Sequence, residues 1–363
     1  MRIPCWPACL LLAALSLTAG CSRQPTETSS LPAAKRFILL TNGNSPFWDT
    51  ARAGLEAAAQ ELQLERDGFQ AVLDVNDGTP QGQIDKLKQF ASQRDIVAVG
   101  VSVIDAANVA VADEMKNLQD KGVHVVTIDS DVDREKFRDA RFAFIGTDNL
   151  AGGQELGTAA RHLRPEGGQY VTFVGRTGAQ NAIERVSGFE QGAGDKFEAL
   201  DNMADDLDRT RARDNVRNAI SNHRGLNVLV GIWSYNAPAI VDVVRQLNRR
   251  SDFTIVVFDA EPVAIKDMEA GFIDAMVVQN PFEMGYQGVR LMKALAQDDK
   301  ATIEEMLPNN GEGDGGDIYD TGLKVVVPDE DSPLNADMFG AKTEFLRLGD
   351  FKNWLAKYGL QGS

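Results

Sequence analysis

Residues 35–50 read Lys-Arg-Phe-Ile-Leu-Leu-Thr-Asn-Gly-Asn-Ser-Pro-Phe-Trp-Asp-Thr, and their pattern recurs along the chain. The apolar run 37–40 has no helical period, which is typical of a strand buried on both faces. Turn-forming residues follow, and Pro46 has the fixed φ that suits a first helical turn. Asn44 or Ser45 is placed to cap free backbone N–H groups. The stretch therefore predicts a strand, a loop and a helix.

The loop of this unit carries two amides and leads into two aromatic residues, Phe47 and Trp48. In open α/β sheets, ligands bind outside the carboxyl ends of the strands, where this loop lies. Taken alone, Phe47 and Trp48 are equally typical of helix residues that face a core. Later strands also end in polar pairs, so we expect several loops to converge on one cleft.

Length and charge narrow the classes of function. A chain of 363 residues exceeds what one core usually serves, so two domains are expected. The 37 basic and 53 acidic residues give a net charge of -16. This charge opposes binding to nucleic acid, to an anionic membrane surface or to a polyanionic ligand.

The amino terminus predicts export from the cytoplasm. Residues 1–20 contain an early Arg2, an apolar run at 8–17 and small residues at 18–20, as in a secretion signal. The apolar run is shorter than the ~20 residues of a membrane-spanning helix. Small residues directly before Cys21 resemble the lipobox of bacterial lipoproteins, although Thr18 stands where that pattern prefers Leu. The resemblance implies cleavage before Cys21 and lipidation of its sulfur; the alternative is an ordinary signal that leaves Cys21 free.

The remaining cysteines, Cys5 and Cys9, lie within the predicted signal. The mature chain is therefore expected to contain no disulfide and no thiol nucleophile. Residues 21–34 are rich in Ser, Thr and Pro, which predicts a flexible tether. The folded body is expected to begin at Lys35.

Strands and helices are predicted to alternate through most of the body. The predicted strands lie at 37–40, 70–75, 96–101, 123–128, 141–146, 169–174, 226–232, 253–258, 273–278 and 323–327. Helices are predicted between them, including 149–163, 181–197, 237–248 and 281–296, and a short closing helix at 345–358. This alternation predicts parallel pairing through right-handed crossovers, hence two doubly wound, Rossmann-like α/β lobes.

The segment 309–317 contains three acids, Glu312, Asp314 and Asp317. Their spacing departs from the twelve-residue calcium loop, so a flexible surface loop without metal is the favoured interpretation.

Six dispersed motifs suggest a family. They are Asn-Ser-Pro-Phe-Trp at 44–48, Val-Thr-Ile-Asp at 126–129, Ile-Gly-Thr-Asp-Asn at 145–149 with Gly-Gly at 152–153, Glu-Arg-Val-Ser-Gly-Phe at 184–189, Val-Val-Phe-Asp at 256–259 and Gln-Asn-Pro-Phe-Glu-Met-Gly at 279–285. In this order, behind a secretion signal, they resemble the periplasmic sugar-binding proteins of the ribose-binding type, the solute receptors of ABC importers. The resemblance covers residues 36–328.

The resemblance implies two lobes joined by a three-segment hinge, the type I periplasmic binding fold. The crossings would lie near Asp148, Gln279 and Val327. The first lobe would contain 35–147 plus 280–326, the second 148–279 plus 327–340, and 341–363 would form a C-terminal tail helix. Such lobes close around a ligand.

The resemblance also implies a sugar site. Ionised Asp accepts hydroxyl protons, Asn and Gln bond in both directions, and aromatic rings cover C–H faces. The implied ligand-binding residues are Asn44, Ser45, Phe47, Trp48, Asp129, Asn181, Tyr235, Asn236, Asp259 and Gln279.

Three of these residues have other interpretations. Asp259 could cap the helix that begins near residue 261. Asp129 could be a loop or cap residue, with Asp131 and Asp133 as alternatives. Tyr235 could simply pack.

Three departures from the ribose-binding pattern concern the ligand. Ser130 and Ile183 each replace an Arg of that pattern, and Leu207 stands where a third aromatic is usual. A site that bonds specific hydroxyls rejects analogues that lack them. We therefore expect a sugar that is not held as ribose is.

The predicted protein is a monomeric lipoprotein of the periplasm or cell envelope that binds a sugar, closes, and delivers it to an ABC importer permease, with no cofactor. A sensor that presents its closed form to a membrane receptor kinase or chemoreceptor is the alternative, and a small polyol or furanose signal is an alternative ligand. An enzyme is not expected, because nucleophile-elbow and phosphate-loop motifs are missing and His124, His162 and His223 are scattered.

Overall fold

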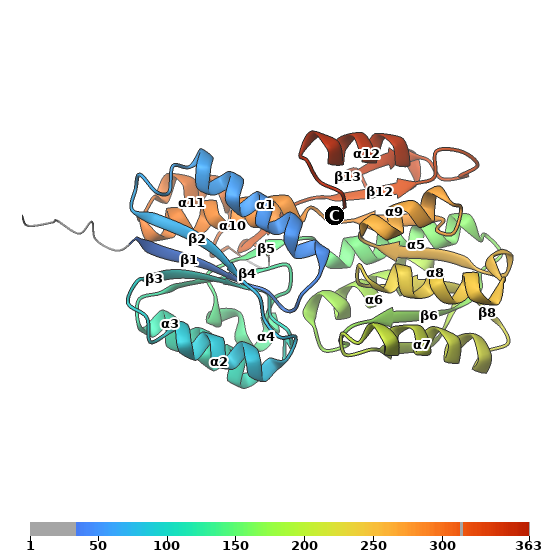
Figure 1. Ribbon diagram of the computed structural model, residues 1–363, viewed down its shortest axis with the longest axis horizontal. Coiled ribbons are helices and arrows are strands. Elements are labelled where there is room, and N and C mark those ends of the chain that lie inside the picture. The colour runs from blue at the N-terminus through green and yellow to red at the C-terminus, as the bar shows by residue number, and fades with distance from the viewer. Residues whose placement is uncertain (1–33, 313–314, 363) are drawn as a thin grey trace, which may run out of the picture. The chain divides into compact units, whose positions relative to one another are not determined.

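Two sheets, each with helices on both faces, account for most of the residues that the computed structural model describes, 34–312 and 315–362. Figure 1 shows these elements in chain order. The predicted α/β fold of two lobes is confirmed. The predicted signal at 1–20, the tether up to residue 33 and the lipidation site Cys21 lie outside the described residues. Both lobes belong to one compact unit that begins at Ala34.

The sheet of the first lobe is entirely parallel, in the order β11-β5-β4-β3-β1-β2. Its strands are β1 (Lys35–Leu40), β2 (Phe69–Asp74), β3 (Ile96–Val101), β4 (His124–Ile128), β5 (Phe144–Gly146) and β11 (Ile318–Asp320). Its helices are α1 (Pro46–Glu61), α2 (Pro80–Phe90), α3 (Val109–Asp120), α4 (Arg134–Phe137), α10 (Pro281–Ala296) and α11 (Lys300–Met306).

Strand β1 is buried on both faces, as the apolar run predicted. Phe37 and Leu39 pack in a core with residues of α1 and α10, whereas Ile38 and Leu40 pack with residues of α2 and α3. Figure 1 shows these two helix pairs on opposite sides of the sheet. Alternate side chains of a strand point to opposite faces, so this one strand joins both cores of the lobe.

The sheet of the second lobe has the order β13-β12-β10-β9-β8-β6-β7, with β10 and β12 antiparallel. Its strands are β6 (Gly168–Val174), β7 (Phe197–Ala204), β8 (Leu226–Gly231), β9 (Thr254–Phe258), β10 (Ala275–Val278), β12 (Leu323–Val327) and β13 (Thr343–Arg347). Its helices are α5 (Asn149–Leu163), α6 (Gln180–Ala193), α7 (Arg209–Asn222), α8 (Asn236–Leu247), α9 (Pro262–Glu269) and α12 (Leu348–Lys357). Three short 3₁₀ helices complete the described elements: Arg138–Ala140, Arg250–Asp252 and Ala336–Met338.

The chain crosses between the lobes at residues 147–148, 279–280 and 321–322. The third crossing comes earlier than the expected position near Val327. All five residues of β12 are buried, and β12 pairs with β10 and β13, so its apolar run completes the second sheet rather than the first. The second lobe therefore begins again near Leu323, not at residue 327.

The C-terminal segment differs from the expected tail helix at 341–363. Residues 343–347 first form β13, an edge strand parallel to β12, and only then does α12 begin. After α12 the chain returns to the first lobe. The ring centroids of Tyr358 and Phe282 lie 5.3 Å apart, and the Thr50 hydroxyl donates to the carbonyl of Gly362 at 3.1 Å. The tail thus contacts both lobes.

Two helices of the second lobe approach closely enough to place a buried arginine. A Cβ at Gly188 of α6 would lie 2.2 Å from the backbone oxygen of Leu150 on α5, so only glycine fits there. This contact brings Arg185 on α6 beside Asn149, the first residue of α5.

The sequence predicts a flexible surface loop for 309–317, and for Asp317 this prediction is wrong. Asp317 is 5% exposed and accepts hydrogen bonds from Arg138 and Arg141. Asp314 lies outside the described residues. Within the described ranges, no group of three His, Cys, Asp or Glu side chains could hold a metal ion.

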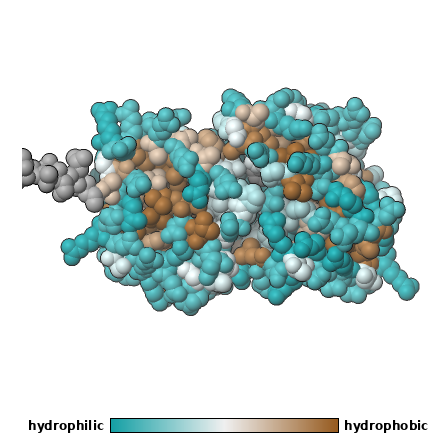
Figure 2. All heavy atoms as spheres, viewed as in Figure 1, coloured by the Kyte–Doolittle hydropathy of each residue, from teal (hydrophilic) through white to brown (hydrophobic). Residues whose placement is uncertain are grey.

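The face shown in Figure 2 is mostly hydrophilic, with separate apolar patches. No helix among residues 34–312 and 315–362 combines the length and the hydropathy that a membrane span requires.

Candidate functional site

A cavity of about 270 Å³ lies between loops at the carboxyl ends of strands from both lobes. Nine of the ten predicted site residues line it, all except Asn236. The additional lining residues are Asn42, Gly43, Asn76, Asp77, Gly78, Arg185, Leu207, Arg209, Trp233 and Ser234. Two sheets that face each other with their carboxyl edges thus enclose the site, as parallel α/β sheets do.

Asp129 follows β4 and is almost completely buried. Its carboxylate accepts hydrogen bonds from the Ser102 hydroxyl at 2.9 Å and the Asn42 amide at 3.3 Å. Burial raises the pKa of Asp129, although the charge of Arg185 and bonds from Ser102 and Asn181 act in the opposite direction. Asp129 is not a helix cap, because Asp133 caps α4.

Asp259 follows β9 in the second lobe and is 3% exposed. It accepts a hydrogen bond from the Gln279 side chain at 2.9 Å, and its carboxylate lies 4.0 Å from the guanidinium of Arg185. Burial raises its pKa to about 6 despite the opposing charge of Arg185. Asp259 does not cap α9, which begins after Glu261 with no side-chain cap bond. The alternative interpretation as a cap is therefore wrong.

Arg185 was not predicted as a site residue, and its charge acts on both of these carboxylates. Its Nε donates to Asn149 at 2.9 Å and its Nη1 donates to the carbonyl of Ile232 at 3.1 Å. The guanidinium carbon lies 4.3 Å from the centroid of the Phe258 ring. Its Nη2 is buried and has no hydrogen-bond partner among the described residues. A buried donor without a partner favours a ligand oxygen at this point.

Phe47 and Trp48 both line the cavity and pack edge to face, with ring centroids 5.1 Å apart. The indole N–H of Trp48 donates to the Asn42 side chain at 3.2 Å, which fixes the ring orientation. Ser45 occupies the N-cap position of α1 but makes no side-chain cap bond, so the predicted capping role is not realised there. Ser45 and Asn44 instead line the cavity.

A further aromatic residue, Trp233, lines the cavity from the second lobe. Its indole N–H donates to Asn181 at 3.3 Å. A Cβ at Gly175 would lie 2.1 Å from its ring, so the glycine makes room for it. The sequence had indicated that Leu207 removes an aromatic surface from this lobe, and Trp233 supplies one from the loop after β8. Its position in the loop that follows a buried strand is the signal that could have identified it.

Tyr235 and Asn236 have different roles from each other. Tyr235 lines the cavity with its ring, while its hydroxyl donates to Asp205 at 2.5 Å. Asn236 is fully buried behind it, donates to Asp205 at 2.9 Å and accepts from the backbone N–H of Trp233. Asn236 therefore supports the loop and does not face the cavity. Burial raises the pKa of Asp205 to about 6.

The fold and this cleft define a two-lobed binding protein whose site contains donors, acceptors and aromatic rings. A model of the periplasmic binding protein domain matches residues 36–300, and the chain belongs to this family. The predicted relationship to the ribose-binding type is confirmed.

Curated relatives and solved structures agree with this assignment. The chain is 24% identical to the D-allose-binding periplasmic protein of Escherichia coli, over 73% of this chain and 86% of the relative. It is also 24% identical to the ribose import binding protein RbsB of Salmonella typhimurium, over 79% of this chain and 90% of the relative. These relatives are binding proteins rather than enzymes, as predicted for this chain.

Two solved structures share the fold. One is GanP, a glucose-galactose binding protein from Geobacillus stearothermophilus, with a TM-score of 0.70, 24% identity, and coverage of 83% of this chain and 99% of that chain. The other is a solute-binding protein from Burkholderia graminis in complex with D-arabinose, with a TM-score of 0.69, 22% identity, and coverage of 84% and 99%.

Proposed function

We propose that this protein captures an uncharged monosaccharide in the cleft and delivers it to an ABC importer. The observation that carries the proposal is that Arg185, Asp129 and Asp259 line one cavity together with the rings of Phe47, Trp48 and Trp233. Ionised carboxylates accept hydrogen bonds from sugar hydroxyls, and the buried Nη2 of Arg185 donates a hydrogen bond to a ligand oxygen.

The charges favour a neutral ligand over an acidic one. Two buried carboxylates face one buried guanidinium, and both carboxylates already have a raised pKa. An anionic ligand would add a further negative charge to a buried site. The relatives that bind D-allose, ribose, glucose and galactose, or D-arabinose support the choice of sugar.

Isothermal titration calorimetry of the compact unit from residue 34 onward, against neutral monosaccharides, disaccharides, polyols and sugar acids, tests this proposal. We expect one-to-one binding of a neutral monosaccharide. Binding only of sugar acids, or of no member of the panel, would contradict it.

We further propose that the mature protein is a monomer attached to the membrane by lipid on Cys21. The small residues before Cys21 support the attachment. Metabolic labelling with a radioactive fatty acid should mark the wild type and leave Cys21→Ser unlabelled. Label on both proteins, or on neither, would contradict lipidation of Cys21.

A receptor role is the second candidate. A solved XylFII–LytSN complex has a TM-score of 0.66 to this chain, 23% identity and coverage of 74% and 95%, so a protein of this fold assembles with a second protein. Uptake of radiolabelled ligand separates the two roles. Deletion of the gene abolishes uptake if the protein serves an importer and leaves uptake unchanged if it serves only a sensor.

A further inference from the structure

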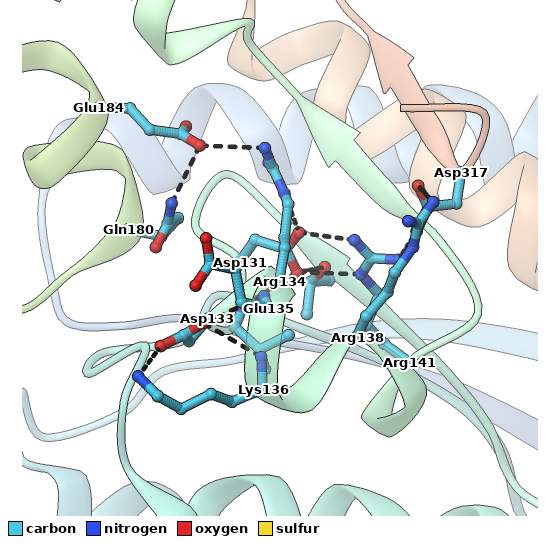
Figure 3. A network of polar contacts seen from close by, with 12 residues as sticks. Asp131, Asp133, Arg134, Glu135, Lys136, Arg138, Arg141, Gln180, Glu184 and Asp317 are labelled. Carbon is cyan, nitrogen blue, oxygen red and sulfur yellow. Dashed lines mark hydrogen bonds and ion pairs between the residues drawn. The ribbon is translucent and has the colours of Figure 1, made fainter. Parts of the chain in front are cut away.

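Arg134 of α4 reaches from the first lobe to the second. Its Nη1 lies 3.0 Å from Oε1 of Glu184 on α6. Figure 3 marks this contact with a dashed line between the two side chains. Neither residue lines the cavity. The two side chains are 28% and 17% exposed, so water screens their interaction only in part.

The arginine is held in place by its own lobe. Its Nε donates to Asp131 at 2.8 Å, and its guanidinium carbon lies 5.0 Å from the centroid of the Phe144 ring. Asp131 is in turn fixed by Arg141 at 2.8 Å and by the Thr127 hydroxyl at 2.6 Å. Burial alone would raise the pKa of Asp131, but bonds and charge from Arg141 hold it below its usual value. Asp131 therefore stays ionised and keeps Arg134 directed at Glu184.

The glutamate is likewise held by the second lobe, since its Oε1 accepts from the Gln180 side chain at 3.0 Å. Surface ion pairs usually contribute little because two long side chains must be ordered to form them. Here each partner is ordered before they meet, so most of that entropy loss is avoided.

The residues that hold Arg134 are also connected to the third crossing segment. Arg141 binds Asp317 as well as Asp131, and Asp317 directly precedes β11. After β11 the chain crosses to the second lobe at 321–322. The network in Figure 3 therefore links the start of β11, which leads into a crossing segment, to an ion pair between the two lobes.

We propose that Arg134 and Glu184 are positioning residues for ligand capture: they form an ion pair when the lobes close, and so retain a ligand that neither of them touches. A contact made only in the closed state stabilises that state, and so strengthens the binding of any ligand that requires the lobes to close. This inference rests on the proposed function. It predicts that the pair acts mainly on the rate of ligand dissociation, because the pair breaks when the lobes open.

The test compares Glu184→Gln with Asp67→Asn as a matched control. Asp67 pairs with Lys293 at 2.7 Å within the first lobe, and the two side chains are similarly exposed, at 33% and 17%. Stopped-flow measurements with the best-binding sugar should show dissociation about fivefold faster for Glu184→Gln, with little change in association. The control should match the wild type. The difference should shrink in 1 M salt, and the melting temperature without sugar should not change.

A double-mutant cycle with Arg134→Gln measures the coupling itself. The double variant should bind no more weakly than Arg134→Gln alone. If the wild type binds no sugar of the panel, the proposed function and this role both fail. If the wild type binds but Glu184→Gln dissociates within twofold of it, or the control is equally impaired, or the two mutations add independently, the inference alone is overturned.

Discussion

We expect the substitution Asp259→Asn to weaken sugar binding while it stabilises the unliganded protein. The ordinary pKa of an aspartate is 3.8, and burial raises that of Asp259 to about 6. Because each pH unit corresponds to 1.36 kcal/mol, the ionised carboxylate costs the folded protein about 3 kcal/mol at pH 7. The asparagine keeps an oxygen that can accept from Gln279 and carries no charge. We therefore expect the unliganded variant to be more stable than the wild type by up to ~3 kcal/mol at pH 7.

The pH dependence has a definite sign. A folded-state pKa above the unfolded value means that the folded protein takes up its proton first as the pH falls. The wild type should therefore regain stability relative to the variant below pH 6, and the two should converge near pH 4. The substitution Asp259→Asn should weaken sugar binding, although it stabilises the unliganded protein. A hydroxyl bonds about twice as strongly to a carboxylate as to a neutral oxygen, so the variant should bind at least about fivefold more weakly.

Urea unfolding at pH 4, 5, 6 and 7, with calorimetric titration of the sugar at pH 7, measures both quantities. Asp131→Asn is the control, because Asp131 is equally buried but Arg141 holds its pKa low. That variant should lose stability at pH 7. The reasoning is refuted if Asp259→Asn is less stable than the wild type at pH 7, or if its stability difference does not depend on pH.

Three further substitutions test the cavity. Arg185→Lys should weaken sugar binding at least tenfold in calorimetry, because one ammonium group cannot bond Asn149 and the Ile232 carbonyl and also offer a fixed donor to the ligand; near-normal affinity would contradict this. Gly175→Ala should weaken binding about tenfold and shift tryptophan emission, because the new Cβ displaces the Trp233 ring; an unchanged spectrum and affinity would count against it. Leu207→Ala should improve disaccharide binding relative to monosaccharide binding, because Leu207 lines the cavity and its side chain lies beside Gly43 and Gly78 of the first lobe; an unchanged ratio would exclude Leu207 as a size limit.

The strands that the sequence did not reveal lie at sheet edges. β7 and β13 are the two edges of the second sheet, and β11 is one edge of the first. None of them has a fully buried residue, so they lack the apolar signature that identified the central strands. Pairing to a neighbour, which is not local in the sequence, holds them in the sheet.

Most of the lining of the candidate cavity was predictable because its residues lie in loops that follow buried strands. Asp129, Asp259 and Tyr235 each lie in such a loop, and the structure brings all three to one cavity. Arg185 was missed because it lies in the middle of a helix, where an arginine usually faces solvent. Its burial depends on the close contact of α5 and α6. The glycines of both helices permit this contact, but their presence in the sequence does not by itself predict it.

The contact of the C-terminal tail with the first lobe affects how this protein can be engineered. Tyr358 packs on Phe282 and Gly362 accepts a hydrogen bond from Thr50, while α12 stands on the second lobe. A purification handle or fluorescent reporter fused after Gly362 would therefore start at a segment that contacts both lobes. If the lobes close as proposed, such a fusion would perturb that closure, which is a drawback for affinity measurements and an advantage for building an optical sugar sensor.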